Sequence, residues 1–328
     1  MEQIKVRTND IRKILEEHIS WSAPVVPEEI SHGDMPGDKV NIEESHINKA
    51  KVIFPELLNM MRQHLANSQN EKVVLTVCGG SGVGKSEIAS LLSFYFRQIG
   101  IGSYTLSGDN YPHRIPQYND AERLHIFRES GLKGMVKAEV LTPERFHIIH
   151  ELQIAKEDAN PVYAQQYPWF ETYIKAGRCG LSNYLGTNKE IGFDEVEEIL
   201  TKFKNGEDKI WLKRMGREDT ELWYEEVDFS NISVLIIEWT HGNSDHYKGV
   251  DIPILLNSTP EETLAHRRSR NRDGATDSPF TTMVLELEQK MLESQAHKAK
   301  IILSKNGELL TFKDYQELMK ESQGGNHE

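Results

Sequence analysis

Residues 73–86 read VVLTVCGGSGVGKS, an apolar run that leads directly into a glycine-rich turn. The apolar run is typical of a buried strand, and Ile88, Leu91 and Leu92 follow the turn at helical spacing. The turn matches the pattern G-x-x-x-x-G-K-S/T, in which backbone N–H groups at the start of a helix surround phosphate oxygens. The residues of this phosphate-binding loop are Gly79, Gly80, Ser81, Gly82, Val83, Gly84, Lys85 and Ser86.

This loop predicts that the chain binds a nucleoside triphosphate. Lys85 is expected to reach the β- and γ-phosphates, and Ser86 is expected to ligate Mg²⁺. Closely spaced glycines also occur in dinucleotide-binding fingerprints, but the Lys85-Ser86 pair and the missing third-glycine spacing favour the triphosphate loop. ATP and Mg²⁺ are therefore the expected cofactors, and no base-recognition motif distinguishes ATP from GTP.

The composition is that of an ordinary globular protein. The chain has 328 residues, of which 38% are hydrophobic and 27% charged, enough for one large domain with an appendage. Its net charge of −13 argues against a nucleic-acid partner, because binding to a phosphate backbone normally needs a basic surface. The only cysteines are Cys78 and Cys179, which indicate neither a disulfide framework nor a four-ligand zinc site. With no signal-like N-terminus and no long apolar run, we expect a cytoplasmic protein without a membrane partner.

Strand and helix patterns alternate from residue 71 onward, which predicts an α/β fold with a mainly parallel sheet flanked by helices. The remaining strands are expected at residues 103–106, 233–237, 250–256 and 301–303, and helices at 85–97, 260–270 and 280–296. Residues 1–70 are predicted to be an N-terminal helical extension, with helices over 9–19 and 55–66 and an extended connector over 23–40. Residues 71–328 are then the nucleotide-binding domain.

Two segments of this domain are expected to serve the second substrate. Residues 111–232 are a long insertion, mostly helical in pattern with short β-like pieces at 210–212 and 222–227, where acceptor specificity should reside. Residues 266–278 carry the densest basic cluster of an acidic chain and are predicted to form a lid, since arginines on a lid can neutralise a transferring phosphoryl group.

Acidic residues follow two of the predicted strands, at the sheet edge where ligands of open parallel sheets bind. Asp109 follows strand 103–106, and we expect it to accept the proton of an acceptor hydroxyl as a general base. Glu238 ends an apolar run and is expected to hold Mg²⁺, directly or through water. Polar residues near these acids would suit a polar or anionic acceptor: Tyr111, His113, Arg114, Lys213 and Arg214.

The chain resembles the phosphoribulokinase, uridine kinase and pantothenate kinase family of P-loop small-molecule kinases. The resemblance covers about residues 71–303 and is carried by residues 79–86, 107–112, 236–238 and 267–273. It implies that Asp109 is the catalytic base or assists the metal, that Glu238 is the later metal-binding acid, and that Arg268 and Arg272 are lid arginines. The family usually has glycine after the acid that corresponds to Glu238, whereas this chain has Trp239.

The resemblance implies a P-loop kinase domain over residues 71–328, and an enzyme that transfers the γ-phosphoryl group of ATP to a hydroxyl of a small metabolite. A sugar, a sugar phosphate or a nucleoside-like alcohol is the expected acceptor, and a homo-oligomer is compatible with the sequence.

Two alternatives stay open. Residues 107–110 also resemble the Gly-Asp-Asn segment of adenylylsulfate kinases, but the later Arg-Asp-Pro-Lys-Gly-Leu-Tyr type of segment has no counterpart and the long insertion favours another acceptor. A nucleotide-switched regulatory or binding protein with slow hydrolysis is the competing class. An acid such as Asp109 beside a pocket argues against a switch, because a switch needs no acceptor base.

Overall fold

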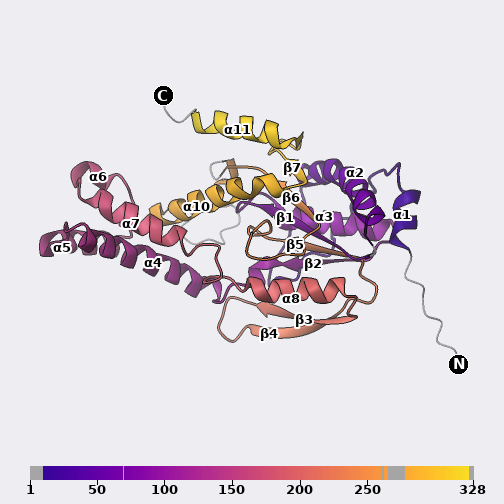
Figure 1. Cartoon of the computed structure of the whole chain (residues 1–328), viewed down its shortest axis with the longest axis horizontal. Helices are drawn as coiled ribbons and strands as arrows, with labels where there is room; N and C mark the ends of the chain where they lie inside the picture. Colours follow the sequence, from indigo (N-terminus) through magenta and orange to yellow (C-terminus); the bar gives the residue numbers. More distant parts are fainter. Residues whose placement is uncertain (1–9, 69, 260–261, 265–277, 325–328) are drawn as a thin grey trace.

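The computed structural model describes residues 10–68, 70–259, 262–264 and 278–324, and its centre is a six-stranded sheet (Figure 1). In spatial order the strands are β2 (Ser103–Ser107), β5 (Val234–Glu238), β1 (Val73–Gly79), β6 (Ile252–Leu256), β7 (Ile301–Leu303) and β8 (Leu309–Leu310). The pairs from β2 to β7 are parallel, and β8 pairs antiparallel with β7. The expected α/β fold with a mainly parallel sheet is confirmed.

Helices cover both faces of this sheet, which is why β1 is buried along its whole length and is mostly apolar. Val73, Leu75 and Val77 pack in one cluster with α2 (Glu44–Ala66) and α3 (Lys85–Gln98). Cys78 points to the other face and packs with α10 (Pro279–Gln295) and α11 (Phe312–Gly324), whereas Val74 packs with α8 (Phe193–Lys204). The phosphate-binding loop therefore lies between a doubly covered central strand and α3.

The N-terminal segment packs into the same core as the sheet. α1 (Ile11–Glu17) lies within the helix predicted over 9–19, but α2 begins at Glu44, well before the predicted start at Pro55. A capping box between Glu43 and His46 starts the helix, and Ile53 and Phe54 are fully buried against the sheet. This burial outweighs the backbone hydrogen bond that Pro55 removes. The division into residues 1–70 and 71–328 stays a prediction.

The long insertion is mostly helical, as predicted, and its first part forms an arm that extends from the sheet (Figure 1). Its elements before α8 are α4 (Pro116–Lys137), α5 (Pro143–Ile154), α6 (Tyr163–Gln166) and α7 (Phe170–Ser182). Glycines let α4 and α7 approach closely: a Cβ on Gly131 would lie 2.6 Å from the Tyr173 ring, and one on Gly177 would lie 2.6 Å from the Phe127 ring. After α8, an antiparallel hairpin of β3 (Lys209–Met215) and β4 (Leu222–Asp228) completes the insertion.

Candidate functional site at the phosphate-binding loop

Two glycines of the loop between β1 and α3 cannot be replaced by larger residues, one because there is no room for a Cβ and one because its φ is positive. A Cβ on Gly79 would lie 2.7 Å from the carbonyl oxygen of Leu256, so no larger residue fits there. Gly84 has a φ of +94° and is the N-cap of α3, a conformation that L side chains rarely adopt. Lys85 begins the helix, and its Nζ donates to the carbonyl oxygen of Gly80 at 3.0 Å, so the ammonium lies over the loop. The arrangement is an anion site at a helix N-terminus.

A buried acid faces this loop from the end of β5. Ser86 Oγ donates to Glu238 Oε2 at 3.0 Å, and Ser107 Oγ donates to Glu238 Oε1 at 2.6 Å. Ser107 reaches it because β2 and β5 pair in a register that sets Ser107 opposite Glu238. Burial and the charge of Asp109 raise the pKa of Glu238 to about 8, against the lowering effect of Ser107, Lys85 and Ser86. A cation at this position would favour the ionised carboxylate.

The Ser86 and Glu238 oxygens fit a Mg²⁺ ion. Both are hard oxygen donors, and Mg²⁺ usually takes only one or two protein ligands and completes its shell with phosphate oxygens and water. Among the described residues no group of three or more His, Cys, Asp or Glu side chains could hold a metal by itself. The pair therefore suits a metal that arrives with a nucleotide.

Asp109 lies in a single 3-10 turn, Gly108–Asn110, at the end of β2. Its side chain is exposed, and its charge raises the pKa of both Glu238 and Glu288. Trp239 packs directly under this turn, since a Cβ on Gly108 would lie 2.0 Å from Trp239 Cγ. Trp239, which stands where the resembled family usually has glycine, thus supports the turn that carries Asp109.

Sequence reasoning missed a charged cluster beside this site. Arg123 of α4 donates through Nε to Glu190 Oε1 at 2.5 Å, and its Nη2 lies 3.8 Å from Glu288 Oε1 of α10. Burial raises the pKa of Glu288, the charges of Arg123 and Lys85 lower it, and those of Glu190 and Asp109 raise it. Glu288 also lines a small pocket with Gly80 and Ser81 of the phosphate loop. No local motif marks these residues, because three distant segments bring them together.

His241 lies in the wall of the same region as a buried neutral base. Burial lowers its pKa to about 4, and the nearby charges include Glu190, Arg123 and Lys85. Its ring packs edge-on against Trp239 with centroids 5.5 Å apart, and its Nδ1 has no hydrogen-bond partner among the described residues. The histidine is therefore uncharged at neutral pH.

This histidine predicts a specific acid sensitivity. Unfolded chain binds the His241 proton near pH 6.5 and folded chain only near pH 4, so the stabilisation is present above pH 6.5 and lost as the pH falls toward 4. We expect the stability advantage of the wild type over His241→Gln to shrink by about 3 kcal/mol between pH 7 and pH 4. Urea unfolding at several pH values gives the free energy of unfolding of each protein. The contributions of the other titrating groups cancel when the value of the variant is subtracted from that of the wild type. Parallel stability curves would contradict it.

The structure separates the predicted acceptor contacts into two groups. Lys213 Nζ donates to the carbonyl oxygen of Pro112 at 3.0 Å, Arg214 is paired within the fold, and Tyr111 is fully buried in an apolar cluster. His113 and Arg114 instead line an open pocket of about 580 Å³ between α4 and the hairpin. The roles of all five residues stay predictions. Arg268 and Arg272, with most of the predicted lid, lie outside the described residues.

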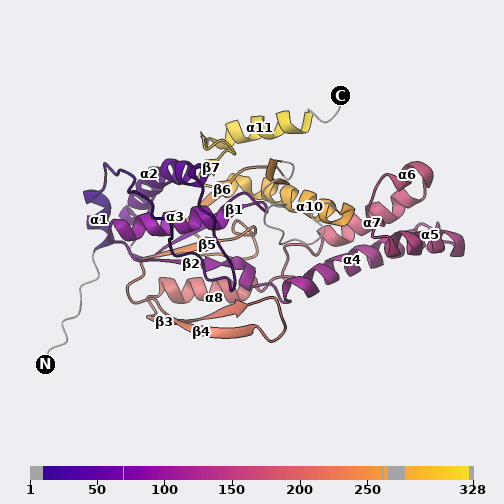
Figure 2. The same cartoon turned by 180° about the vertical axis from the view of Figure 1, so that it is seen from behind.

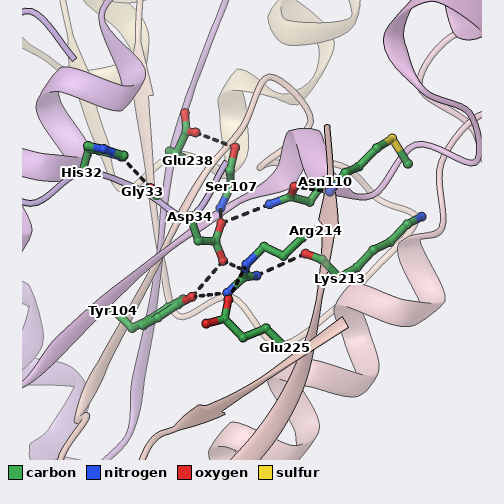
Figure 3. Close-up of polar contacts among 11 residues, drawn as sticks. His32, Gly33, Asp34, Tyr104, Ser107, Asn110, Lys213, Arg214, Glu225 and Glu238 are labelled. Carbon is green, nitrogen blue, oxygen red and sulfur yellow. Dashed lines mark hydrogen bonds and ion pairs between the residues drawn. The ribbon is translucent and has the colours of Figure 1, made fainter. Parts of the chain in front are cut away.

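Arg214 binds a residue that sequence reasoning overlooked (Figure 3). Asp34 belongs to the connector between α1 and α2, and its Oδ2 accepts from Arg214 Nη1 at 2.9 Å. Glu225 Oε2 accepts from Arg214 Nε at 3.1 Å. The connector was expected only to be extended, and no sequence signal connects it with the hairpin.

The chain is similar to one curated protein, the bifunctional alpha-galactosidase/sucrose kinase AgaSK of Mediterraneibacter gnavus. The two are 43% identical over 241 residues, which is 74% of this chain. The chain spans about a fifth of the length of that relative (21%). The name of this relative includes a kinase of a small molecule, which agrees with the resemblance to small-molecule kinases. No family model matches the chain.

The solved structures that match this chain include three that are named as kinases. A putative fructose transport system kinase from Silicibacter sp. TM1040 is 13% identical and matches 73% of this chain and 93% of its own, with a TM-score of 0.43. A possible uridine kinase from Bacillus stearothermophilus is 15% identical over 75% and 98% of the two chains, with a TM-score of 0.38. D-glycerate 3-kinase from Cryptococcus neoformans is 11% identical over 81% and 98%, with a TM-score of 0.43.

None of the helices in the described part of the chain has the length and apolar character needed to cross a membrane.

Proposed function

We propose that this chain, which has the fold of a P-loop kinase, transfers the γ-phosphoryl group of ATP to a hydroxyl of a neutral sugar. The observation that carries the proposal is geometric: Ser107 of β2 lies opposite Glu238 of β5, and Asp109 follows two residues later in the turn. Glu238 in turn accepts a hydrogen bond from Ser86 of the phosphate loop. The similarity to a protein named as a sucrose kinase makes sucrose the first acceptor to test. The acidic net charge and two free cysteines support a cytoplasmic enzyme of small molecules.

The donor side of the reaction is served by the phosphate loop. Backbone N–H groups at the start of α3 and the Lys85 ammonium bind the triphosphate and neutralise its negative charge. Mg²⁺, when bound through Ser86 and Glu238, supplies further charge neutralisation. Arg268 and Arg272 are proposed to add to this from the lid.

The acceptor side is served by Asp109. Its carboxylate accepts the proton of the sugar hydroxyl while the hydroxyl oxygen bonds to the γ-phosphorus and the bond from that phosphorus to the bridging oxygen breaks. ADP and a sugar phosphate are the products, and the proton passes from Asp109 to solvent. The exposure of Asp109 allows this exchange.

We place the sugar in the pocket that His113 and Arg114 line. It lies next to the Asp109 turn, because Asn110 Oδ1 accepts from the backbone N–H of Met215, another lining residue, at 3.0 Å. Its volume of about 580 Å³ falls within the range of about 300–1,000 Å³ that is usual for small-molecule sites.

The charges of this pocket favour a neutral acceptor over a phosphorylated one. Arg114 Nη2 lies 3.6 Å from Glu122 Oε1, and its Nη1 donates to the Tyr184 hydroxyl at 3.1 Å. Asp219 adds a second carboxylate, which accepts from the Tyr118 hydroxyl at 2.7 Å. A phosphate would meet one guanidinium against two carboxylates, whereas sugar hydroxyls can donate to the carboxylates and accept from Arg114.

The function is tested by ADP formation from Mg²⁺-ATP with a panel of sucrose, glucose, fructose, sugar phosphates, nucleosides and adenylylsulfate. We expect a neutral sugar to raise the rate about tenfold or more over the acceptor-free rate, with one phosphorylated sugar per ADP. Lys85→Ala is the control, because it removes phosphate binding. If only adenylylsulfate raises the rate, the protein is an adenylylsulfate kinase. If ATP hydrolysis is slow and no compound of the panel changes its rate, the protein is a nucleotide switch.

A further inference from the structure

We infer that Asp34, in the connector between α1 and α2, is a positioning residue for the turn that carries Asp109. The inference rests on the proposed function and adds a residue of the N-terminal segment to the machinery of the site. The connector has no regular secondary structure between α1 and α2, and Figure 2 shows it passing from these helices toward β2.

The connector reaches the catalytic edge of the sheet at Gly33 and Asp34. A Cβ on Gly33 would lie 3.4 Å from Thr105 Cγ2 and 3.9 Å from Glu238 Oε1, so the chain passes beside the buried acid. Asp34 follows directly, and its side chain is only 8% exposed. Figure 3 shows its carboxylate between the end of β2 and the hairpin.

Each oxygen of the Asp34 carboxylate has a distinct task. Oδ1 accepts from the backbone N–H of Ser107 at 2.7 Å and from Asn110 Nδ2 at 3.1 Å. Oδ2 accepts from the Tyr104 hydroxyl at 3.0 Å and from Arg214 Nη1 at 2.9 Å. Oδ1 thus binds the turn at the residues before and after Gly108 and Asp109, whereas Oδ2 anchors the carboxylate to β2 and the hairpin.

The turn depends on this support because it has little structure of its own. It is a single 3-10 turn of three residues, closed by the bond from the Tyr111 N–H to the Gly108 carbonyl oxygen. Asp34 also helps to position Glu238. It binds the backbone N–H of Ser107, and the Oγ of Ser107 donates to Glu238. One carboxylate therefore fixes both the general base and the hydroxyl that orients the metal-binding acid.

The charge of Asp34 suits this role. Burial raises the pKa of Asp34 to about 6, and the Arg214 guanidinium together with the Ser107 and Tyr104 donors opposes that rise. The carboxylate is therefore ionised at neutral pH and accepts from all four donors. An asparagine of the same shape has only one acceptor oxygen and cannot replace it.

The test compares Asp34→Asn with Asp158→Asn in the full-length chain. Asp158 is a matched control because it is buried, binds Arg128 through two hydrogen bonds of 2.8 and 2.9 Å, and accepts from the Tyr173 hydroxyl at 3.0 Å, but it lies in the arm. We expect Asp34→Asn to lower kcat about 10- to 100-fold with an unchanged dissociation constant for ATP. Asp158→Asn is expected to lose a similar amount of stability and to retain kcat.

A second variant and a second measurement distinguish a failure of the inference about Asp34 from a failure of the proposed function. Tyr104→Phe removes a bond to Oδ2 but leaves both bonds to the turn, so its kcat should stay within about threefold of the wild type. Amide hydrogen exchange of residues 103–111 should accelerate in Asp34→Asn only, and this readout needs no phosphoryl transfer. Equal kcat losses in Asp34→Asn and Asp158→Asn, or unchanged exchange, would overturn the inference. A wild type that phosphorylates nothing would overturn the proposed function while the exchange result still decides the role of Asp34.

Discussion

Asp109→Asn is expected to lower the rate of phosphoryl transfer by about 10²- to 10⁴-fold while ATP binds as tightly as before. Asparagine keeps the shape of the side chain but cannot take the acceptor proton. The Asp109 side chain is exposed at the end of β2. Single-turnover transfer to the best sugar and titration with ATP measure the two quantities separately.

The control for Asp109 is another exposed acid, Glu129, which lies on the arm helix α4 and pairs with Lys133 at 2.9 Å. Glu129→Gln should behave as the wild type in both measurements. Unchanged transfer in Asp109→Asn would remove Asp109 from the role of general base. A weakening of ATP binding instead of transfer would assign it to the nucleotide and its metal.

Glu190→Ala is expected to destabilise the protein by about 3–5 kcal/mol. Glu190 is fully buried and accepts from Asn119 Nδ2 at 3.0 Å, from Arg123 Nε at 2.5 Å and from the backbone N–H of Gly186 at 2.6 Å. Burial raises the pKa of Glu190, but the Arg123 guanidinium and the Gly186 N–H outweigh it and hold the pKa below its usual range. Truncation leaves the Arg123 charge in the interior without its main partner.

Thermal and urea unfolding measure this loss, which corresponds to a fall in Tm of roughly 4–7 °C for a chain of this length. Glu286→Ala is the matched control, because Glu286 forms an equally close pair with Arg178 at 2.6 Å but is 47% exposed. Exposed pairs contribute about 0–1 kcal/mol. Equal losses in the two variants would mean that burial does not set the strength of the Glu190 pair.

Much of the fold could be predicted from the sequence because its signals are local. The apolar run before Gly79 and the periodic positions after Ser86 specify a strand, a turn and a helix without reference to any distant residue. The acid that ends β5 could be placed at the ligand edge for the same reason, since parallel strands end together. Glu238 indeed lies within hydrogen-bond distance of Ser86.

The parts that sequence reasoning missed depend on distant contacts or on weak local signals. Pro55 suggested a helix start, but buried residues before it extend α2 by eleven residues. The short strand β8 and the helix α11 follow the last of the predicted strands, residues 301–303, and were not predicted. Asp34 and Glu190 look like ordinary polar residues in the sequence, and only their partners in other segments reveal what they do.

The Asp34–Arg214 pair also sets an order of events during protein synthesis. The two residues are 180 positions apart, and ribosomes add about 5–20 residues per second, so Arg214 is made about 10–40 s after Asp34. The connector therefore leaves the ribosome long before the hairpin that neutralises its carboxylate exists. The turn with Asp109 can take its final position only after the hairpin has been synthesised, which makes closure of the catalytic edge a late step in the folding of the nascent chain.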